Sequence, residues 1–133
     1  MTKTEAISFI KEMYQEVLTK FDTKKVETYF SPDYQQVTDG KVSTLDEFKK
    51  HLSTLKEMTT QLAIPAFHDV LFDEETQQAC FRYTVHVDLA SGDGGLIDVT
   101  ALFTLSDGRI IRCDELTRAH EKHEMLEQLG HIS

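Results

Sequence analysis

The sequence predicts an α+β domain in which three N-terminal helices pack on one face of a strongly curved, mostly antiparallel sheet. Apolar residues recur at helical spacing over roughly the first 60 residues, and apolar and polar residues then alternate with the two-residue period of strands. Helices followed by a run of strands are typical of α+β proteins. The length of 133 residues suits one core, so we expect a single domain over residues 1–133.

Three helices are expected before residue 61. The first spans residues 4–21, where six apolar side chains share one face. They are Ile7, Ile10, Tyr14, Val17, Leu18 and Phe21. A second, short helix follows an N-cap at Asp22 or Thr23 and ends at Ser31-Pro32, because a residue before proline avoids the helical region. The third helix begins at a capping box, Thr44-Leu45-Asp46-Glu47, and its apolar stripe reaches residue 58.

The remaining sequence predicts strands joined by short turns. Residues 33–42 form a small hairpin whose tight turn is Asp39-Gly40. Residues 62–72 form a strand interrupted at Pro65, which is expected at an edge or a bulge. Three longer strands follow, at residues 81–89, 97–105 and 109–118. From His120 the chain is expected to form a short helix or a loose tail.

Composition and charge argue against several classes of protein. The net charge of -9 disfavours a nucleic-acid partner, because such proteins neutralise phosphates with clustered Lys and Arg. Charged residues interrupt the first 20 residues, and no apolar stretch reaches the length of a transmembrane helix, so we expect no signal peptide and no membrane association. Cys80 and Cys113 are too few for a disulfide scaffold and suit a reducing compartment. We therefore expect a cytoplasmic protein.

The order of elements and two local motifs resemble the NTF2-like (cystatin-like) superfamily. Residues 29–34, Tyr-Phe-Ser-Pro-Asp-Tyr, are similar to its hydrophobic–Phe–x–x–Asp exit from the second helix, and residues 106–111, Ser-Asp-Gly-Arg-Ile-Ile, to its last hairpin. The resemblance spans about residues 5–118, is strongest to the SnoaL-like and ketosteroid-isomerase-like branches, and leaves residues 119–133 as a tail or short helix. It implies a cone around an internal pocket and sheet-to-sheet dimers, but a shared fold says little about activity.

The resemblance matches only part of the ketosteroid-isomerase site. It places Tyr14 at the tyrosine that donates a hydrogen bond to the developing oxyanion. The carboxylate base falls at about Thr38, and a threonine cannot act as a base at neutral pH. The second oxyanion donor falls near Thr100 or Ala101, with Asp98 a pleat or more away. The aspartate and histidine of polyketide cyclases also lack a clear match, so steroid isomerisation is not expected.

Glu115 is the best acidic candidate for the pocket. On the last strand we expect Ile110 on the outer face and Ile111 at the first inward position, and alternation then turns Cys113, Glu115 and Thr117 inward. A carboxyl group buried there would have a raised pKa and could act as a general acid or base. Two alternatives stay open: a register off by one residue, or pairing of Glu115 with an arginine at the sheet rim.

Tyr14 and Glu115 are therefore the expected catalytic residues, with plain packing as the alternative for Tyr14. The expected ligand-binding set adds aromatic, apolar, thiol and imidazole side chains around them. It comprises Tyr14, Phe30, Tyr34, Phe48, His51, Tyr83, Val85, Val99, Ala101, Phe103, Cys113 and Glu115. No metal is expected, because His120-x-x-His123 has no third ligand at a recognised spacing. No cofactor is expected, since the glycines at 92–95 do not open a helix that could hold a phosphate.

Two functions fit these features. The first is an enzyme of the isomerase, cyclase or hydrolase type that acts by acid–base chemistry on a small hydrophobic carbonyl compound. The second is a non-catalytic module that binds a hydrophobic ligand or dimerises. The outer sheet face mixes charged side chains with Leu96, Leu102 and Leu116, so it is the expected homodimer interface.

Overall fold

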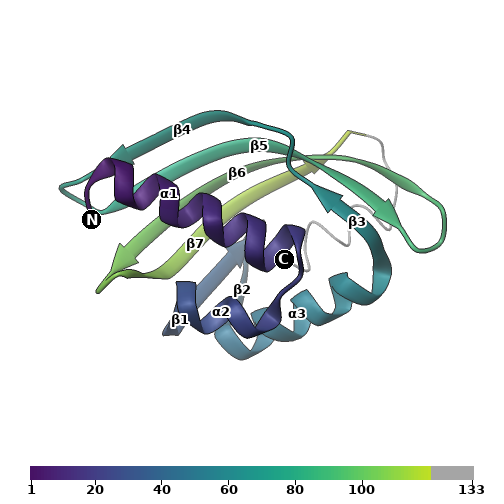
Figure 1. Ribbon diagram of the computed structural model, residues 1–133, viewed down its shortest axis with the longest axis horizontal. Helices are drawn as coiled ribbons and strands as arrows, with labels where there is room; N and C mark the ends of the chain where they lie inside the picture. Colours follow the sequence, from purple (N-terminus) through teal and green to yellow (C-terminus); the bar gives the residue numbers. More distant parts are fainter. Residues whose placement is uncertain (121–133) are drawn as a thin grey trace.

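Three helices cover one face of a curved, seven-stranded sheet in the computed structural model, which describes residues 1–120 (Figure 1). The helical elements are α1 (Lys3–Met13), the π-helix η1 (Tyr14–Thr19), the 3-10 helix η2 (Thr23–Lys25), α2 (Val26–Tyr29) and α3 (Leu45–Met58). The strands are β1 (Phe30–Thr38), β2 (Lys41–Thr44), β3 (Thr59–Ala63), β4 (Phe67–Asp73), β5 (Gln78–Leu89), β6 (Gly94–Ser106) and β7 (Arg109–Ala119). The predicted α+β architecture is confirmed.

The sheet runs in the order β2-β1-β7-β6-β5-β3, and β4 also pairs with β5. All pairs are antiparallel except β1 and β7, which are parallel. β3 and β4 share the same edge of β5, so the strand predicted over residues 62–72 is in fact two strands. Pro65 lies in the gap between them, outside both strands, so the sheet does not need the backbone N–H that proline lacks.

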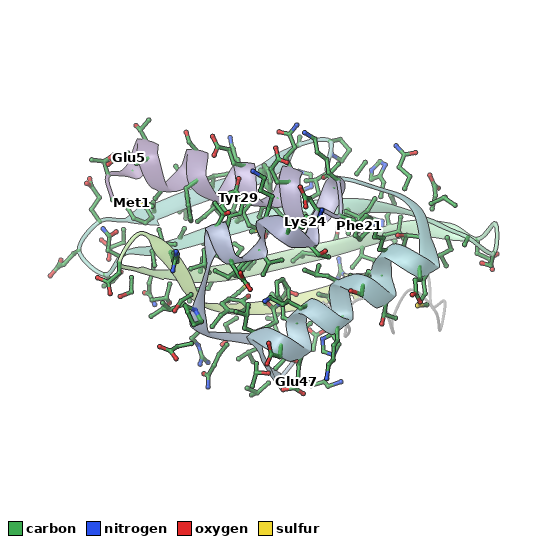
Figure 2. The ribbon with its side chains drawn as sticks, turned by 60° about the horizontal axis from the view of Figure 1, so that its bottom comes forward. Met1, Glu5, Phe21, Lys24, Tyr29 and Glu47 are labelled. Carbon is green, nitrogen blue, oxygen red and sulfur yellow. The ribbon has the colours of Figure 1, made fainter. Side chains whose placement is uncertain are left out.

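The helices follow the prediction except at their ends. α1 begins at a capping box of Thr2 and Glu5 and continues into η1, so the last turns of the predicted first helix are π-helical. Asp22 caps η2 through the N–H of Lys24, as predicted. α2 ends at Tyr29, one residue earlier than expected. Figure 2 shows α2 between α1 and α3 in the helical layer, with the strands behind them.

The predicted hairpin turn at Asp39-Gly40 joins β1 and β2. Both residues have positive φ, 49° and 85°, as a two-residue turn that matches the twist of the flanking strands requires. β1 begins at Phe30, three residues before the predicted hairpin, because the chain enters the sheet directly from α2.

The prediction for the start of β7 is wrong. Ile110, expected on the outer face, is fully buried, and Ile111, expected inward, is only half-buried. Thr104 pairs with Arg112 while Leu105 pairs with Ile110, so β7 has one extra residue, Ile111, opposite this step of β6. Such a β-bulge resets the alternation of side chains beyond it.

The inner faces of β5 and β6 form the core with the helices, as their alternation predicts. Their buried side chains are Phe81, Tyr83, Val85, Val87, Leu89, Ile97, Val99, Ala101, Phe103 and Leu105. On the outer face Leu102 is 41% and Leu116 65% exposed.

No helix within residues 1–120 is long and apolar enough to cross a membrane. β7 takes in Ala119, and the N–H of the next residue, His120, donates to the Leu96 carbonyl at 2.9 Å. The rest of the predicted tail, residues 121–133, lies outside the described residues.

Replacing Thr44 by Ala is expected to lower the free energy of unfolding by about 1 kcal/mol, the usual effect of losing an N-cap. The Thr44 hydroxyl accepts the Glu47 N–H at 3.3 Å, and the Glu47 carboxylate accepts the Thr44 N–H at 3.1 Å. Urea unfolding measures the change. Thr54→Ala, in the exposed middle of the same helix, is the matched control and is expected to leave stability equal or slightly higher, because Ala is the better helix former. Equal losses in both variants would contradict the capping role.

Candidate functional site

A cavity lies between the helices and the concave face of the sheet. Its volume is about 60 Å³. The wall is mostly apolar. Its residues are Met13, Tyr14, Leu18, Gln36, Phe48, Leu55, Leu62, Ile64, Tyr83, Val85, Val87, Ile97, Val99, Phe103, Cys113, Glu115 and Thr117.

Most of the sequence-predicted site residues line this cavity. They are Tyr14, Phe48, Tyr83, Val85, Val99, Phe103, Cys113 and Glu115. Phe30, Tyr34 and Ala101 are buried in the core but are not part of the wall. Phe30 and Tyr34 pack behind Phe48, with ring centroids 5.0 and 5.3 Å from its ring. They therefore support the cavity without facing it.

His51, the remaining predicted residue, lies on α3 and does not line the cavity. Its Nδ1 atom is buried and has no hydrogen-bond partner among the described residues. Burial lowers the pKa of His51, and the nearby Lys41 lowers it further. The imidazole is therefore held in its neutral form beside the apolar stripe of α3, apart from the cavity wall.

Glu115 is the ionisable group at the centre of the site. Its side chain projects from β7 into the space between β1 and the cavity, and the residue is 7% exposed. Oε1 accepts a hydrogen bond from Gln36 Nε2 at 2.9 Å and one from the Thr38 hydroxyl at 3.0 Å. The Cys113 thiol lies 4.0 Å from Oε2. Both stronger hydrogen bonds thus fall on one carboxyl oxygen.

Burial raises the pKa of Glu115 from 4.5 to about 8. The hydrogen bond from Thr38 opposes this rise, the charge of the nearby Asp39 carboxylate adds to it, and the hydrogen bond from Gln36 opposes it again. Desolvation is the largest of these effects, so Glu115 is mostly protonated at neutral pH and exchanges its proton close to the pH of a cell. No arginine pairs with it in the described part of the chain, which answers the rim-pairing alternative.

Tyr14, the other predicted catalytic residue, begins η1 and is 3% exposed. Its ring is held by the rings of Phe67, Phe81, Tyr83 and Phe103, with centroids 5.0–6.0 Å away. Its hydroxyl is buried and makes no hydrogen bond of normal geometry to any described residue, although the Tyr83 side chain lies close enough to influence the pKa of Tyr14. A buried hydroxyl without a partner is costly, which makes it available to a ligand.

The other polar groups of the wall stay neutral near neutral pH. Burial raises the pKa of Tyr14, Tyr83 and Cys113 well above their usual values, and the negative charge of an ionised Glu115 adds to each rise. Among the described residues that line the cavity, Glu115 is therefore the one whose charge changes near neutral pH.

Sequence reasoning missed the polar partners of Glu115. Gln36 and Thr38 are 4% and 2% exposed and follow Tyr34 at every second position of β1, so all three side chains point inward. This spacing was the signal in the sequence that could have identified them, but it covers only three positions and two of the three side chains are polar, so it does not read as a buried face. Their meeting with Glu115 depends on the parallel pairing of β1 with β7, which joins positions 77–79 residues apart and leaves no local trace.

The hairpin turn closes the polar end of the site. The Asp39 N–H donates to the Glu115 carbonyl at 2.9 Å, and the Asp39 carboxylate accepts the Thr117 N–H at 2.8 Å and the Thr117 hydroxyl at 2.5 Å. These bonds fix β7 at Glu115 and two residues beyond it. Within residues 1–120, no cluster of three or more His, Cys, Asp or Glu side chains could hold a metal ion.

Comparisons with known proteins agree with this architecture. Residues 10–113 match the SnoaL-like domain family. An uncharacterised protein of Schizosaccharomyces pombe is 31% identical over 127 residues, which cover 94% of this chain and 95% of that protein.

Similar solved structures include AusH from Aspergillus nidulans, with a TM-score of 0.79 and 14% identity, covering 92% of this chain and 89% of that one. A proposed polyketide cyclase of Xanthomonas campestris has a TM-score of 0.75 and 16% identity, covering 98% of each chain. An LEH-like epoxide hydrolase of Mycobacterium tuberculosis has a TM-score of 0.71 and 17% identity, covering 95% of this chain and 90% of that one. At these identities the likeness shows a shared fold alone, which confirms the predicted cone.

The raised pKa of Glu115 predicts a pH-dependent stability that Glu115→Gln removes. Between pH 4.5 and about 8 the unfolded chain releases a proton that the folded protein keeps, so the free energy of unfolding contributed by Glu115 falls as pH rises. The slope is about 1.4 kcal/mol per pH unit. Urea unfolding should therefore show the variant gaining stability relative to wild type from pH 5 to 8 and no further above pH 8. If the difference in free energy of unfolding between wild type and Glu115→Gln is the same at every pH, the raised pKa of Glu115 is contradicted.

Proposed function

Because the chain belongs to the SnoaL-like domain family of NTF2-like proteins, we propose that its cavity binds a small, neutral, hydrophobic molecule bearing a carbonyl oxygen, and that Glu115 exchanges a proton with it. One observation carries this proposal: a buried carboxyl group with a pKa of about 8 and an unpartnered tyrosine hydroxyl line the same apolar cavity.

The polarity of the wall supports this class of ligand. Below pH 8 the groups of Glu115, Tyr14, Tyr83 and Cys113 are protonated, so the cavity offers hydrogen-bond donors and no net charge. A cationic ligand would find no fixed anion there, and an anionic ligand would oppose the ionisation of Glu115. A neutral molecule with an acceptor oxygen gives the Tyr14 hydroxyl the partner that it lacks.

The two groups together suit acid–base chemistry of the isomerase or cyclase type. Glu115 in its ionised form could take a proton from the carbon next to the carbonyl, while the Tyr14 hydroxyl donates a hydrogen bond to the oxygen on which negative charge develops. Glu115 then returns the proton to another carbon. A pKa close to neutral populates both forms of Glu115, which is the condition that favours such a base and acid.

A non-catalytic binding module is the second candidate. Glu115 is the one described residue of the wall that titrates near neutral pH, so the site lacks a second, complementary acid or base. A binding site needs only the apolar wall and the Tyr14 donor. The two candidates differ in what Glu115→Gln does, since a binder keeps its function without an exchangeable proton.

Thermal-shift titrations with cyclic and aryl ketones test the ligand class. Tyr14→Phe is expected to weaken binding about tenfold, because one hydrogen bond to the carbonyl oxygen is lost while the ring packing stays. Tyr29→Phe removes a hydroxyl from a buried tyrosine that does not line the cavity, and binding should be unchanged. Equal ketone affinity in wild type and Tyr14→Phe would exclude Tyr14 from recognition.

Hydrogen–deuterium exchange at the carbon next to the carbonyl of a bound ketone, followed by NMR, separates the two candidates. An enzyme should catalyse this exchange, and Glu115→Gln should abolish it while retaining ketone binding, because the amide cannot accept the proton. No exchange in wild type, with binding present, favours the binding module. Equal thermal shifts and equal exchange rates in wild type and Glu115→Gln would exclude Glu115 from both ketone binding and proton exchange.

We also propose that the outer sheet face forms a homodimer interface. Leu71 and Leu102 lie in one cross-strand row and Leu116 in the next, and Arg82 and Arg118 are paired with Asp69 and Asp98 on this side of the sheet. Three exposed leucines, surrounded by charged side chains that are already paired with each other, could pack against the same surface of a second copy of the chain.

Sedimentation is expected to show a dimer for wild type and a monomer for Leu116→Asp, since a carboxylate would be buried at the contact. Ser53→Asp, on the exposed side of α3, is the matched control and should remain dimeric. A monomeric wild type would exclude this interface.

A further inference from the structure

We propose that Tyr34 and Gln36 are positioning residues that keep the exchangeable proton of Glu115 on Oε2. This inference rests on the proposed role of Glu115 as the group that exchanges a proton with the ligand. It adds which of the two carboxyl oxygens does so, and which side chains make that choice.

The two carboxyl oxygens of Glu115 have different surroundings. Oε1 accepts from Gln36 Nε2 at 2.9 Å and from the Thr38 hydroxyl at 3.0 Å, whereas Oε2 has only the Cys113 thiol, 4.0 Å away, among the described residues. A proton on Oε1 would point at donors that already occupy its lone pairs, and at least one of them would have to turn away. A proton on Oε2 disturbs neither hydrogen bond.

The Gln36 amide is one of the two donors to Oε1, and the orientation of this amide is set by the contact of its carbonyl oxygen. The Tyr34 hydroxyl donates to Gln36 Oε1, so Nε2 is left to face Thr38 and Glu115. Turning the amide over would set its carbonyl oxygen against the carboxyl oxygen and would leave the Tyr34 hydroxyl facing an NH₂ group. Gln36 is 4% exposed, so solvent is a poor substitute for either contact.

Tyr34 is itself fixed by packing. Its ring lies edge-on to Phe30, with centroids 4.6 Å apart, and 5.3 Å from Phe48, and the residue is 2% exposed. Tyr34 and Phe30 were expected to touch the ligand. The structure instead puts them behind the wall, where the aromatic cluster aims one hydroxyl at one amide oxygen.

The donors then run in a single direction along β1. Tyr34 donates to Gln36, Gln36 donates to Thr38 and to Glu115, and Thr38 donates to Glu115. The two donors of this chain that reach Glu115, Gln36 Nε2 and the Thr38 hydroxyl, both end on Oε1. Because residues two apart on a strand share a face, this order needs only the alternation of β1 and its register with β7, which pairs Thr38 with Glu115.

Other ionisable groups around Glu115 come from every element packed against it, and the test variants leave all but Tyr34 in place. They are Tyr14 on α1–η1, Tyr34 on β1, Asp39 in the hairpin turn, Tyr83 on β5, and Cys113 and Asp114 on β7. Asp39 and Asp114 both oppose ionisation of Glu115, and because the test variants retain both carboxylates, their effect is common to all the proteins compared.

Infrared difference spectroscopy of the ligand-free protein tests where the proton lies. The C=O stretch of protonated Glu115 is identified as the band absent from Glu115→Gln. With the proton on Oε2, the C=O oxygen is Oε1, whose two hydrogen bonds lower the stretching frequency. Tyr34→Phe frees the amide to turn over, and Gln36→Leu deletes the donor, so both variants should raise the frequency. Tyr29→Phe, which lies outside the network, should not.

The pKa of Glu115, measured by ¹³C NMR of its carboxyl carbon, gives a second readout. Losing the donor to Oε1 removes a contact that favours the charged form, so the pKa should rise by about 0.5–1 pH unit in Gln36→Leu, and in the same direction in Tyr34→Phe. A lower melting temperature alone, with both signatures unchanged, would mean that Tyr34 acts only in packing and would overturn the proposal.

Two further outcomes keep this test separate from that of the proposed function. Should Tyr34→Phe fail to fold, Gln36→Leu still decides whether Oε1 is the C=O oxygen. A wild-type frequency that does not respond to Gln36→Leu places the proton on Oε1 and overturns the proposal. Since both measurements use the protein without ligand, a failure of ketones to bind contradicts the proposed function and leaves this result standing.

Discussion

The site depends on the parallel pairing of β1 with β7. This pairing sets Gln36 beside Cys113 and Thr38 beside Glu115, and it brings the Asp39 turn against the β7 backbone. A carboxyl group buried without hydrogen bonds is strongly destabilising, so Glu115 is tolerable only where β1 supplies donors. The remaining strands are antiparallel and could form the concave face alone, but they place no polar partner next to Glu115.

The same contacts set the balance between the two charge states of Glu115. The apolar wall and the Asp39 carboxylate favour the neutral form, while Thr38 and Gln36 favour the charged form. Because desolvation is the larger effect, the pKa of Glu115 rises to about 8, which is still close to the pH of a cell. Ionisation of Glu115 therefore lowers the free energy of unfolding. Carboxyl groups with a purely structural role are usually stabilised in their charged form, whereas a raised pKa is typical of carboxyl groups that exchange protons.

Much of the fold could be predicted from the sequence because its signals are local. The capping box at Thr44, the turn at Asp39-Gly40 and the alternation of the long strands each involve neighbouring residues, and the structure confirms them. The polar half of the site could not be predicted in this way. Thr38 was considered only as a base that it cannot be, whereas its hydroxyl acts as a donor to a carboxyl group 77 residues away.

The inward position of Glu115 shows how a correct expectation can rest on an incomplete reason. Simple alternation from a buried Ile110 would turn Arg112 and Asp114 inward and Glu115 out to solvent. The bulge at Ile111 adds one residue to β7, so that Ile110, Cys113 and Glu115 all face the core. Placing Ile110 outside gave the same parity by a different route. The bulge, not the alternation, therefore decides that an acidic side chain enters an apolar cavity, because one residue fewer before it would exchange the two faces of the whole strand.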